Sequence, residues 1–346
     1  MAYTTINKSS SFQDTKLYAG NGGTQTISGV GFQPNLTWFK NRSEAFDHAL
    51  YDTVRGAYWT IQTNTNSTQT ANDGLTSWTS DGFNIGNVNN TNKNGNNIVA
   101  WNWKAGTTSG LSGGTITPTS YSINTTSKFG IYKYTGNNTS GATISHGLGA
   151  VPTLIFIKRY ESTTGSWQVL GNGFGQPGPN SYGILNSTDG FASNANRWNN
   201  TAPTTSLFSL GNSAEVNASG GIYIAYVWCN VSGYFKSGLY QGNGNADGPF
   251  VYTGGSPTFT IMRPNIAGKN WYMWDDKRNG YNGSLKFNYP NTNGAEGDIS
   301  TYVNMLSNGF KIITTDNSFN GLGNSYQYWC WMQTLVGTNN TPANAR

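Results

Sequence analysis

The 346-residue sequence is poor in charge and in long apolar runs. Charged residues make up 10% of it, against roughly 25% in an average protein, and the net charge of +5 is spread along the chain. Without a block of Lys and Arg, the sequence lacks the electrostatic footprint of a nucleic-acid-binding protein. No run of about 18 apolar residues occurs, so no membrane insertion is predicted. Residues 1–6 have neither the charged nor the apolar region of a signal peptide.

Cysteine and histidine are equally scarce, with two of each. Two cysteines in so long a chain do not make a disulfide framework, and Cys229 and Cys330 both stand beside tryptophans in strand-like runs. We expect two buried free thiols, with a disulfide as the alternative. His48 and His146 fit neither a zinc-protease nor a nucleophile-elbow pattern. We expect no metal site, no cofactor and no catalytic residue.

Glycine and aromatic residues are abundant instead. The 45 Gly are about twice the usual share of roughly 7%. The 12 Trp, 20 Tyr and 16 Phe exceed what a disordered chain carries. Small turn-forming residues that punctuate short aromatic runs are typical of short strands joined by tight turns, so the sequence predicts an all-β protein.

A threefold repeat is most visible around three prolines. Pro34, Pro152 and Pro257 lie 118 and 105 residues apart, and each leads from a glycine-containing turn into a strand-like run. In the first run Leu36 and Trp38 point to one side, with the period of two that marks a strand. Repetition at a nearly fixed spacing indicates that one structural unit recurs along the chain.

Other motifs recur in step with the prolines. Each unit opens with a Tyr-x-Gly-Asn turn signal, and two units share a Ser-(Asp/Asn)-Gly-Phe hairpin signal. Each unit closes on an alternating aromatic strand with large residues on both faces, so we expect central strands that are covered on two sides. The closing runs are residues 98–103, 223–228 and 326–331.

These patterns predict three tandem β-sandwich units of about 100 residues, of the jelly-roll or concanavalin-like kind. We expect a hinged first unit, because a Gly/Ser/Thr-rich linker follows it that can also add a strand. The predicted segments are an N-terminal arm (1–11), repeat 1 (12–105), the linker (106–128), repeat 2 (129–232), repeat 3 (233–336) and a C-terminal tail (337–346).

Two Asp-x-x-Arg clusters are the strongest candidates for chemistry. Asp52 and Arg55 in the first unit match Asp275 and Arg278 in the third, whereas the second unit has Trp167 and no charge in this region. Residues three apart on a strand face opposite sides, so a direct pair needs a turn or a bulge. A catalytic acid with a tuning arginine is one interpretation. The one we favour is structural, with each pair fixing a turn.

Aromatic residues beside polar stretches are candidates for stacking on a sugar or on a partner. The alternative is that they plug the ends of the sandwiches. The weak candidates for glycan or partner contact are Tyr58, Trp59, Trp198, Trp271 and Tyr281.

Taken together, the motifs at residues 18–22 (Tyr-Ala-Gly-Asn-Gly), 31–34 (Gly-Phe-Gln-Pro), 38–42 (Trp-Phe-Lys-Asn-Arg), 51–56 (Tyr-Asp-Thr-Val-Arg-Gly), 80–83 (Ser-Asp-Gly-Phe) and 99–105 (Val-Ala-Trp-Asn-Trp-Lys-Ala) resemble a family of uncharacterised bacteriophage proteins, chiefly from phages of marine and cyanobacterial hosts. The resemblance covers nearly the whole chain. It implies a virion structural protein without defined catalytic residues, placed in the tail and host-attachment apparatus or as a capsid decoration.

We therefore expect a non-enzymatic protein located in the virion and assembled in the host cytoplasm, with other virion proteins as partners and a host surface glycan as a further one. A glycan-binding or glycan-degrading enzyme of the tailspike type is the alternative. Aromatic surface and open sheet edges favour a homo-oligomer, for which a trimer is the expected state, with the arm at residues 1–11 clasping another subunit or the capsid.

Overall fold

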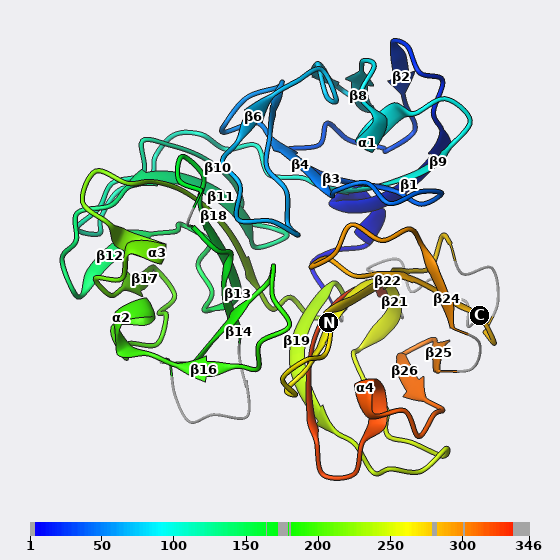
Figure 1. Ribbon diagram of the computed structural model, residues 1–346. Helices are drawn as coiled ribbons and strands as arrows, with labels where there is room; N and C mark the ends of the chain where they lie inside the picture. Colours follow the sequence, from blue (N-terminus) through cyan, green and yellow to red (C-terminus); the bar gives the residue numbers. More distant parts are fainter. Residues whose placement is uncertain are drawn as a thin grey trace.

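The computed structural model describes residues 4–163, 165–171, 179, 181–278, 282–299 and 302–334. The chain is mostly β, with 44% strand and 6% helix, and its sheets are antiparallel. Figure 1 shows three lobes around a common centre. We call residues 4–105 the first lobe, 106–232 the second lobe and 233–334 the third lobe. No helix of the described part is long and apolar enough to span a membrane.

Each lobe contains one larger sheet. In the first lobe its order is β1 (Gln13–Ala19), β9 (Asn97–Trp103), β3 (Leu36–Asn41) and β4 (Ala49–Asp52). In the second lobe it is β10 (Ser120–Asn124), β11 (Phe129–Thr135), β18 (Ile222–Cys229), β13 (Pro152–Arg159), β14 (Gln168–Gly171), β15 (Ser181–Ile184) and β16 (Ala192–Ser193). In the third lobe it is β19 (Phe235–Gln241), β27 (Ser325–Thr334), β21 (Gly255–Pro264), β22 (Tyr272–Asp275), β23 (Leu285–Asn288) and β24 (Gly297–Ile299).

Smaller sheets and short helices complete the lobes. The smaller sheets are β2 (Gln25–Ile27), β8 (Gly82–Ile85) and β7 (Ser77–Thr79); β12 (Ala142–Ser145) and β17 (Leu207–Leu210); β20 (Phe250–Tyr252), β26 (Gly309–Ile312) and β25 (Val303–Leu306); and the pair β5 (Trp59–Thr60) and β6 (Thr70–Ala71). The helices are η1 (Ser9–Ser11), α1 (Asn89–Asn92), α2 (Ala195–Trp198), α3 (Ala214–Asn217) and α4 (Asn317–Asn320). The hairpins predicted at the two Ser-(Asp/Asn)-Gly-Phe signals, Ser80–Phe83 and Ser307–Phe310, are confirmed as β7–β8 and β25–β26.

One strand order recurs in the three larger sheets. The strands β1-β9-β3-β4, β11-β18-β13-β14 and β19-β27-β21-β22 stand in equivalent places, each with the closing aromatic strand second and the proline-led strand third. The linker adds β10 to the outer edge of β11, as predicted.

At each Tyr-x-Gly-Asn motif the turn is held by a buried asparagine from a short helix. In the first lobe Asn92, the last residue of α1, donates from Nδ2 to the carbonyl oxygens of Gly23 and Gly86 and accepts from the backbone N–H of Asn21. A Cβ at Gly20 would meet the carbonyl oxygen of Lys93, so only glycine fits there. Asn217 and Asn320 make the same contacts with the turns at Asn137 and Asn243.

The closing strands are buried on both faces, which confirms that part of the prediction. Along β9, Ile98 and Ala100 pack in a core between the sheets of the first lobe, while Trp101 and Trp103 point into a different cluster. The second and third lobes likewise have cores of their own. The remaining cluster, which we call the shared core, takes residues from all three lobes.

Three equivalent tryptophans meet in the shared core. Trp103, Trp228 and Trp331 occupy equivalent positions in β9, β18 and β27, and their ring centroids lie 5.4 to 6.1 Å apart in edge-to-face contacts. Aromatic pairs in this geometry contribute about 0.5–1.5 kcal/mol each beyond burial. The expectation that the first unit is hinged is wrong, because its aromatic strand is packed into this common core.

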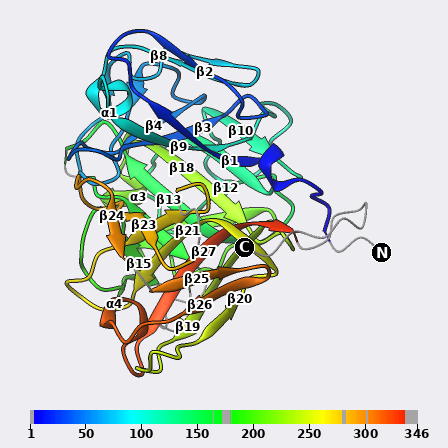
Figure 2. The same ribbon diagram turned by 90° about the vertical axis from the view of Figure 1, so that its right-hand side faces the viewer.

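The N-terminal arm also lies against its own chain. Ile6 is 1% exposed and belongs to the shared core. Ser9 Oγ donates to Gln333 Oε1 of the third lobe at 2.7 Å, and Figure 2 shows η1 beside the end of β27. From residue 4 onward the arm thus links the third lobe to the first within one chain. Its predicted contact with another subunit or the capsid stays a prediction.

Candidate functional site

The Asp52–Arg55 pair forms in a turn at the end of β4. Asp52 Oδ1 accepts the backbone N–H of Val54 at 3.0 Å and of Arg55 at 2.8 Å, and Oδ2 accepts from Arg55 Nε at 2.6 Å. A further donor comes from the second lobe, where Tyr226 Oη lies 2.7 Å from Asp52 Oδ2. Both Asp52 and Tyr226 are fully buried.

The Asp275–Arg278 pair repeats this turn at the end of β22. Asp275 Oδ1 accepts the backbone N–H of Lys277 and of Arg278, and Oδ2 accepts from Arg278 Nε at 2.6 Å. The donor from the neighbouring lobe is here Trp101 Nε1 of the first lobe, 3.0 Å from Asp275 Oδ2. The second lobe has Gly171 at this position, paired with Leu154 as Asp52 is with Leu36.

These carboxylates cannot serve as acids or bases for an external substrate. Asp52 and Asp275 are both buried at 0% exposure, and each already accepts hydrogen bonds from two backbone N–H groups, a guanidinium and an aromatic side chain. A general base must reach the proton that it removes. The structure therefore supports the structural interpretation, in which the pair fixes a turn and presents a buried acceptor to the neighbouring lobe.

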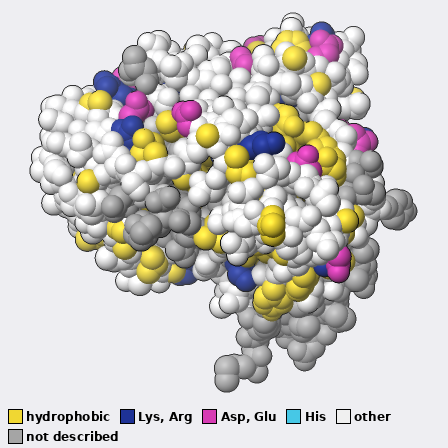
Figure 3. All heavy atoms as spheres, turned by 60° about the horizontal axis from the view of Figure 1, so that its bottom comes forward, with side chains coloured by type: hydrophobic (Ala, Val, Ile, Leu, Met, Phe, Trp, Pro, Cys, Tyr) yellow, Lys and Arg dark blue, Asp and Glu magenta, His cyan; other side chains and the backbone are white. Residues whose placement is uncertain are grey.

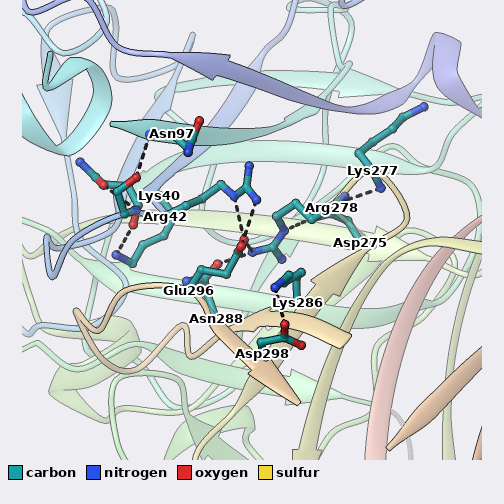
Figure 4. Close-up of polar contacts among 12 residues, drawn as sticks. Lys40, Arg42, Asn97, Asp275, Lys277, Arg278, Lys286, Asn288, Glu296 and Asp298 are labelled. Carbon is teal, nitrogen blue, oxygen red and sulfur yellow. Dashed lines mark hydrogen bonds and ion pairs between the residues drawn. The ribbon is translucent and has the colours of Figure 1, made fainter. Parts of the chain in front are cut away.

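At the third-lobe pair a longer ion network crosses to the first lobe. Arg278 and Arg42 both point at Glu296 from opposite sides (Figure 4). Arg278 Nη1 lies 3.0 Å from Glu296 Oε2, and Arg42 binds the same carboxylate through Nε at 2.7 Å and Nη2 at 3.0 Å. Arg278 also donates to Asn288. Glu296 directly precedes β24 and Arg42 directly follows β3. The two arginines that bind the Glu296 carboxylate therefore link these two strands.

A second recurring feature is a buried cation six residues after each proline. Lys40, Lys158 and Arg263 are each 0% exposed, and burial lowers the pKa of Lys40 and of Lys158 to about 8. Each donates to backbone carbonyl oxygens of a neighbouring lobe: Lys40 to Asn293 at 3.2 Å, Lys158 to Asn66 at 3.0 Å, and Arg263 to Thr188 and Asp189 at 3.1 and 2.5 Å. The first lobe thus donates to the third, the second to the first, and the third to the second.

The residue directly before β4, β14 or β22 also donates a hydrogen bond to a neighbouring lobe, and the order of donor and acceptor lobes is the same as for the cations. His48 Nδ1 accepts from Trp38 Nε1, so Nε2 carries the proton and donates to the Tyr289 carbonyl at 3.0 Å. Burial holds the pKa of His48 well below its usual value, so the ring is neutral. At the matching positions Trp167 donates to Gln62 at 2.8 Å and Trp271 to Ile184 at 3.1 Å.

Sequence reasoning missed the cations and these ring N–H donors. The signal was visible, because Lys40, Lys158 and Arg263 occupy one position, six residues after the proline, in buried strands with almost no other charge. A charge inside such a strand requires a partner, and a repeated charge requires a repeated partner.

The aromatic candidates divide into two groups. Tyr58 and Trp59 are 49% and 40% exposed, so their rings are available for stacking. Trp198 and Trp271 are 1% and 0% exposed, so the expectation that they offer a face to a ligand is wrong. Trp198 belongs to the core of the second lobe, and Trp271 belongs to the shared core. Tyr281 lies outside the described residues.

A polar pocket of about 200 Å³ lies where the first lobe meets the third. Its walls come from η1, from the start of β1 and from the turn after β22, and it is lined by Gln13, Asp14, Thr15, Thr258, Asp276 and Lys277 among others. No group of three or more His, Cys, Asp or Glu side chains in the described residues could hold a metal ion. Cys229 and Cys330 are buried free thiols, as predicted, and burial raises the pKa of each to about 12.

Comparison with known proteins gives a family and no function. The model of a family described as Domain of unknown function (DUF7483) matches residues 8–334. No curated protein and no solved structure matches the chain.

Proposed function

The chain belongs to this family of unknown function, and we propose that it is a non-enzymatic structural protein of a bacteriophage particle, built from three β-sandwich repeats closed into a ring. The observation that carries the proposal is the set of buried cations, Lys40, Lys158 and Arg263, each bound by carbonyl oxygens of a different neighbour. A head-to-tail contact that repeats in one direction either closes into a ring or continues as a filament. With three lobes the contacts return to the start.

A structural role fits the way in which charge is used. The Asp–Arg pairs and the cation contacts are buried between or within lobes, where they bind protein groups. The face in Figure 3 carries few charged side chains, which stand in small separate groups. Such a protein gains its rigidity from packing and from satisfied internal hydrogen bonds, as a particle exposed to the environment requires.

The place on the particle and the partners are part of the same proposal. The motifs that resemble phage proteins support a location on the virion surface, in the tail and host-attachment apparatus or as a capsid decoration, beside other virion proteins. The test is mass spectrometry of purified particles from an infected host, followed by a density map of the particle. Absence of the chain from washed, intact particles would overturn the proposal.

Self-association is a further element of the proposal, with a trimer as the expected state. Sedimentation of the full chain and of a variant that lacks residues 1–11 measures it. A monomer in both cases would leave attachment to a different virion protein as the mode of assembly.

Glycan binding or degradation is the second candidate, and the exposed Tyr58–Trp59 pair favours it. Aromatic faces of this kind can stack on sugar rings. Incubation of the purified chain with polysaccharide from the host surface separates the candidates. Reproducible release of oligosaccharides would establish an enzyme and exclude the non-enzymatic role. Loss of that release in the double variant Tyr58→Ala/Trp59→Ala would assign sugar binding to this pair.

A further inference from the structure

The pocket between the first and third lobes contains a buried hydrogen-bond donor that has no partner. Gln13 is 3% exposed and lines the pocket. Its Oε1 accepts from Thr258 Oγ1 at 3.3 Å, whereas its Nε2 has no hydrogen-bond partner among the described residues. A buried unsatisfied donor costs about 1–3 kcal/mol, so a ligand that presents an acceptor to this wall would gain a hydrogen bond.

Acceptor groups and a cation stand on the same walls. Asp14 and Asp276 are half-buried, and Lys277 is exposed at the rim. Burial raises the pKa of Asp14 to about 6, against the lowering effect of Lys277 and Lys16 and with a smaller raising effect from Asp276. At neutral pH the pocket therefore offers carboxylate acceptors, an amide donor and an ammonium donor within one small space.

This combination selects one chemical class. An anion would be repelled by the carboxylates of Asp14 and Asp276. A cation would be repelled by Lys277 and could not accept from the amide N–H of Gln13. Hydroxyl groups satisfy both kinds of wall, because each can donate to a carboxylate and accept from an N–H. The volume of about 200 Å³ lies below the ~300–1,000 Å³ of pockets for drug-sized ligands, so it has room for one ring.

We propose that this pocket binds a single neutral monosaccharide unit, with the Gln13 amide donating to a ring or hydroxyl oxygen and Asp14 accepting from hydroxyl groups. The inference goes beyond the structural role and does not depend on the particle. It also differs from the Tyr58–Trp59 surface, which would stack on a sugar through exposed rings.

The junction of the first and second lobes supplies a matched control. The corresponding pocket there has a volume of about 460 Å³ and is lined by no charged side chain. Asn35 stands where Thr258 stands, one residue after the proline, and its amide is satisfied by Thr53 Oγ1 at 3.2 Å and by the N–H of Ala105 at 2.8 Å. We expect no sugar site at this second pocket.

Calorimetric or NMR titration of the full chain tests the inference. The probes are glucose, galactose, mannose and N-acetylglucosamine, with calcium chloride and inorganic phosphate as separate arms. We expect saturable binding of at least one sugar, weakened roughly tenfold or more by Gln13→Leu, since one hydrogen bond to a buried group is lost. Asp14→Asn should weaken it as well, and Ser120→Ala in the other pocket should leave it unchanged.

Several outcomes would overturn the proposal. One is wild-type protein that shows no saturable binding of any of these sugars. Another is sugar binding that Gln13→Leu leaves intact while the variant keeps the wild-type unfolding temperature. Binding of calcium or phosphate that Gln13→Leu abolishes would assign the pocket to an ion instead. The particle role is decided separately, because detection of the chain in virions does not depend on any of these titrations.

Discussion

Two junctions between lobes use the same Asp–Arg turn but differ in the contacts around it. One joins the first and third lobes, and the other joins the first and second. Asp275–Arg278 and Asp52–Arg55 make identical backbone and guanidinium contacts. The neighbour then contributes an indole in one case and a phenol in the other. Arg278 continues to Glu296, whereas Arg55 Nη1 ends on the carbonyl oxygen of Trp59 at 3.0 Å. The turn is therefore a local device, and the neighbouring lobe determines how much charge collects around it.

The second lobe shows what happens without the turn. Gly171 stands where the other lobes have aspartate, and Trp167 still reaches Gln62 of the first lobe through its indole N–H. A junction can thus be held by neutral donors and packing. An ion pair is therefore not required at a junction, which is consistent with the modest net contribution of most buried ion pairs to the free energy of unfolding.

The largest expected effect is loss of the arginine from one turn. Arg278→Met leaves the buried Asp275 without its guanidinium and removes one of the two cations on Glu296. Breaking a buried pair in this way costs about 3–5 kcal/mol. Arg55→Met should cost less, because it affects Asp52 alone, whereas Arg278→Met also removes one of the two cations on Glu296. Urea unfolding followed by tryptophan fluorescence measures both, and an equal or reversed order would refute the distinction between the junctions.

A smaller effect is expected from the phenol that crosses to Asp52. Tyr226→Phe removes the donor at 2.7 Å and keeps the ring, so it should lower the free energy of unfolding by about 1–3 kcal/mol. Tyr234→Phe is the control. Tyr234 is also fully buried, yet its hydroxyl has no partner in the described part of the chain, so its removal should be neutral or slightly stabilising. Equal losses in the two variants would show that the cross-lobe bond contributes nothing.

Local features of this fold could be read from the sequence, and contacts between lobes could not. The strand runs, the Asp81–Gly82 hairpin and the turn nature of the Asp–Arg clusters follow from spacing and turn chemistry, which act over a few residues. The alternation of Trp101 and Ala100 indicated a strand covered on two sides. It did not indicate that the second cover is the rest of the same chain, because period-two alternation records burial and not the identity of the neighbour.

The candidate site was harder still to predict. Gln13 and Asp14 lie in a segment that has no motif, and Asp276 comes from more than 200 residues away. Only the closure of the lobes brings them together. Tyr58 and Trp59 were found because exposed aromatics next to turns are visible locally, and Trp198 was misassigned because the same local pattern also precedes a buried plug.

A third prediction uses pH to separate the junctions by their cations. The pKa of Lys40 is lowered by burial to about 8, from 10.5, so between these values the folded state binds fewer protons than the unfolded state. The free energy of unfolding should therefore rise with pH across about 8 to 10.5, by about 2 kcal/mol. Lys40→Met should remove the Lys40 part of this rise, which is measured as the difference from wild type at each pH, whereas Lys158, with a pKa also lowered to about 8, keeps its own part. Arg263→Met should leave the part of the rise below about pH 10 unchanged, because burial lowers the pKa of Arg263 only to about 10.

The smallest expected effect is at the pocket. The pKa of Asp14 is raised from 3.8 to about 6 by burial, with Lys277 and Lys16 opposing the shift and Asp276 adding to it. Between about pH 4 and pH 6 the folded state then binds more protons than the unfolded state. The free energy of unfolding falls as pH rises through this window, and the cost is fully present above it. Because Asp14 is only half-buried, solvent reduces that cost to about 1 kcal/mol. Asp14→Asn should be more stable than wild type by this amount at pH 7 and equal to it near pH 4. Other groups, including the buried His48, titrate identically in both proteins and cancel in the difference. A difference that does not change with pH would mean that Asp14 titrates normally, and the pocket would then lack the desolvation that its geometry implies.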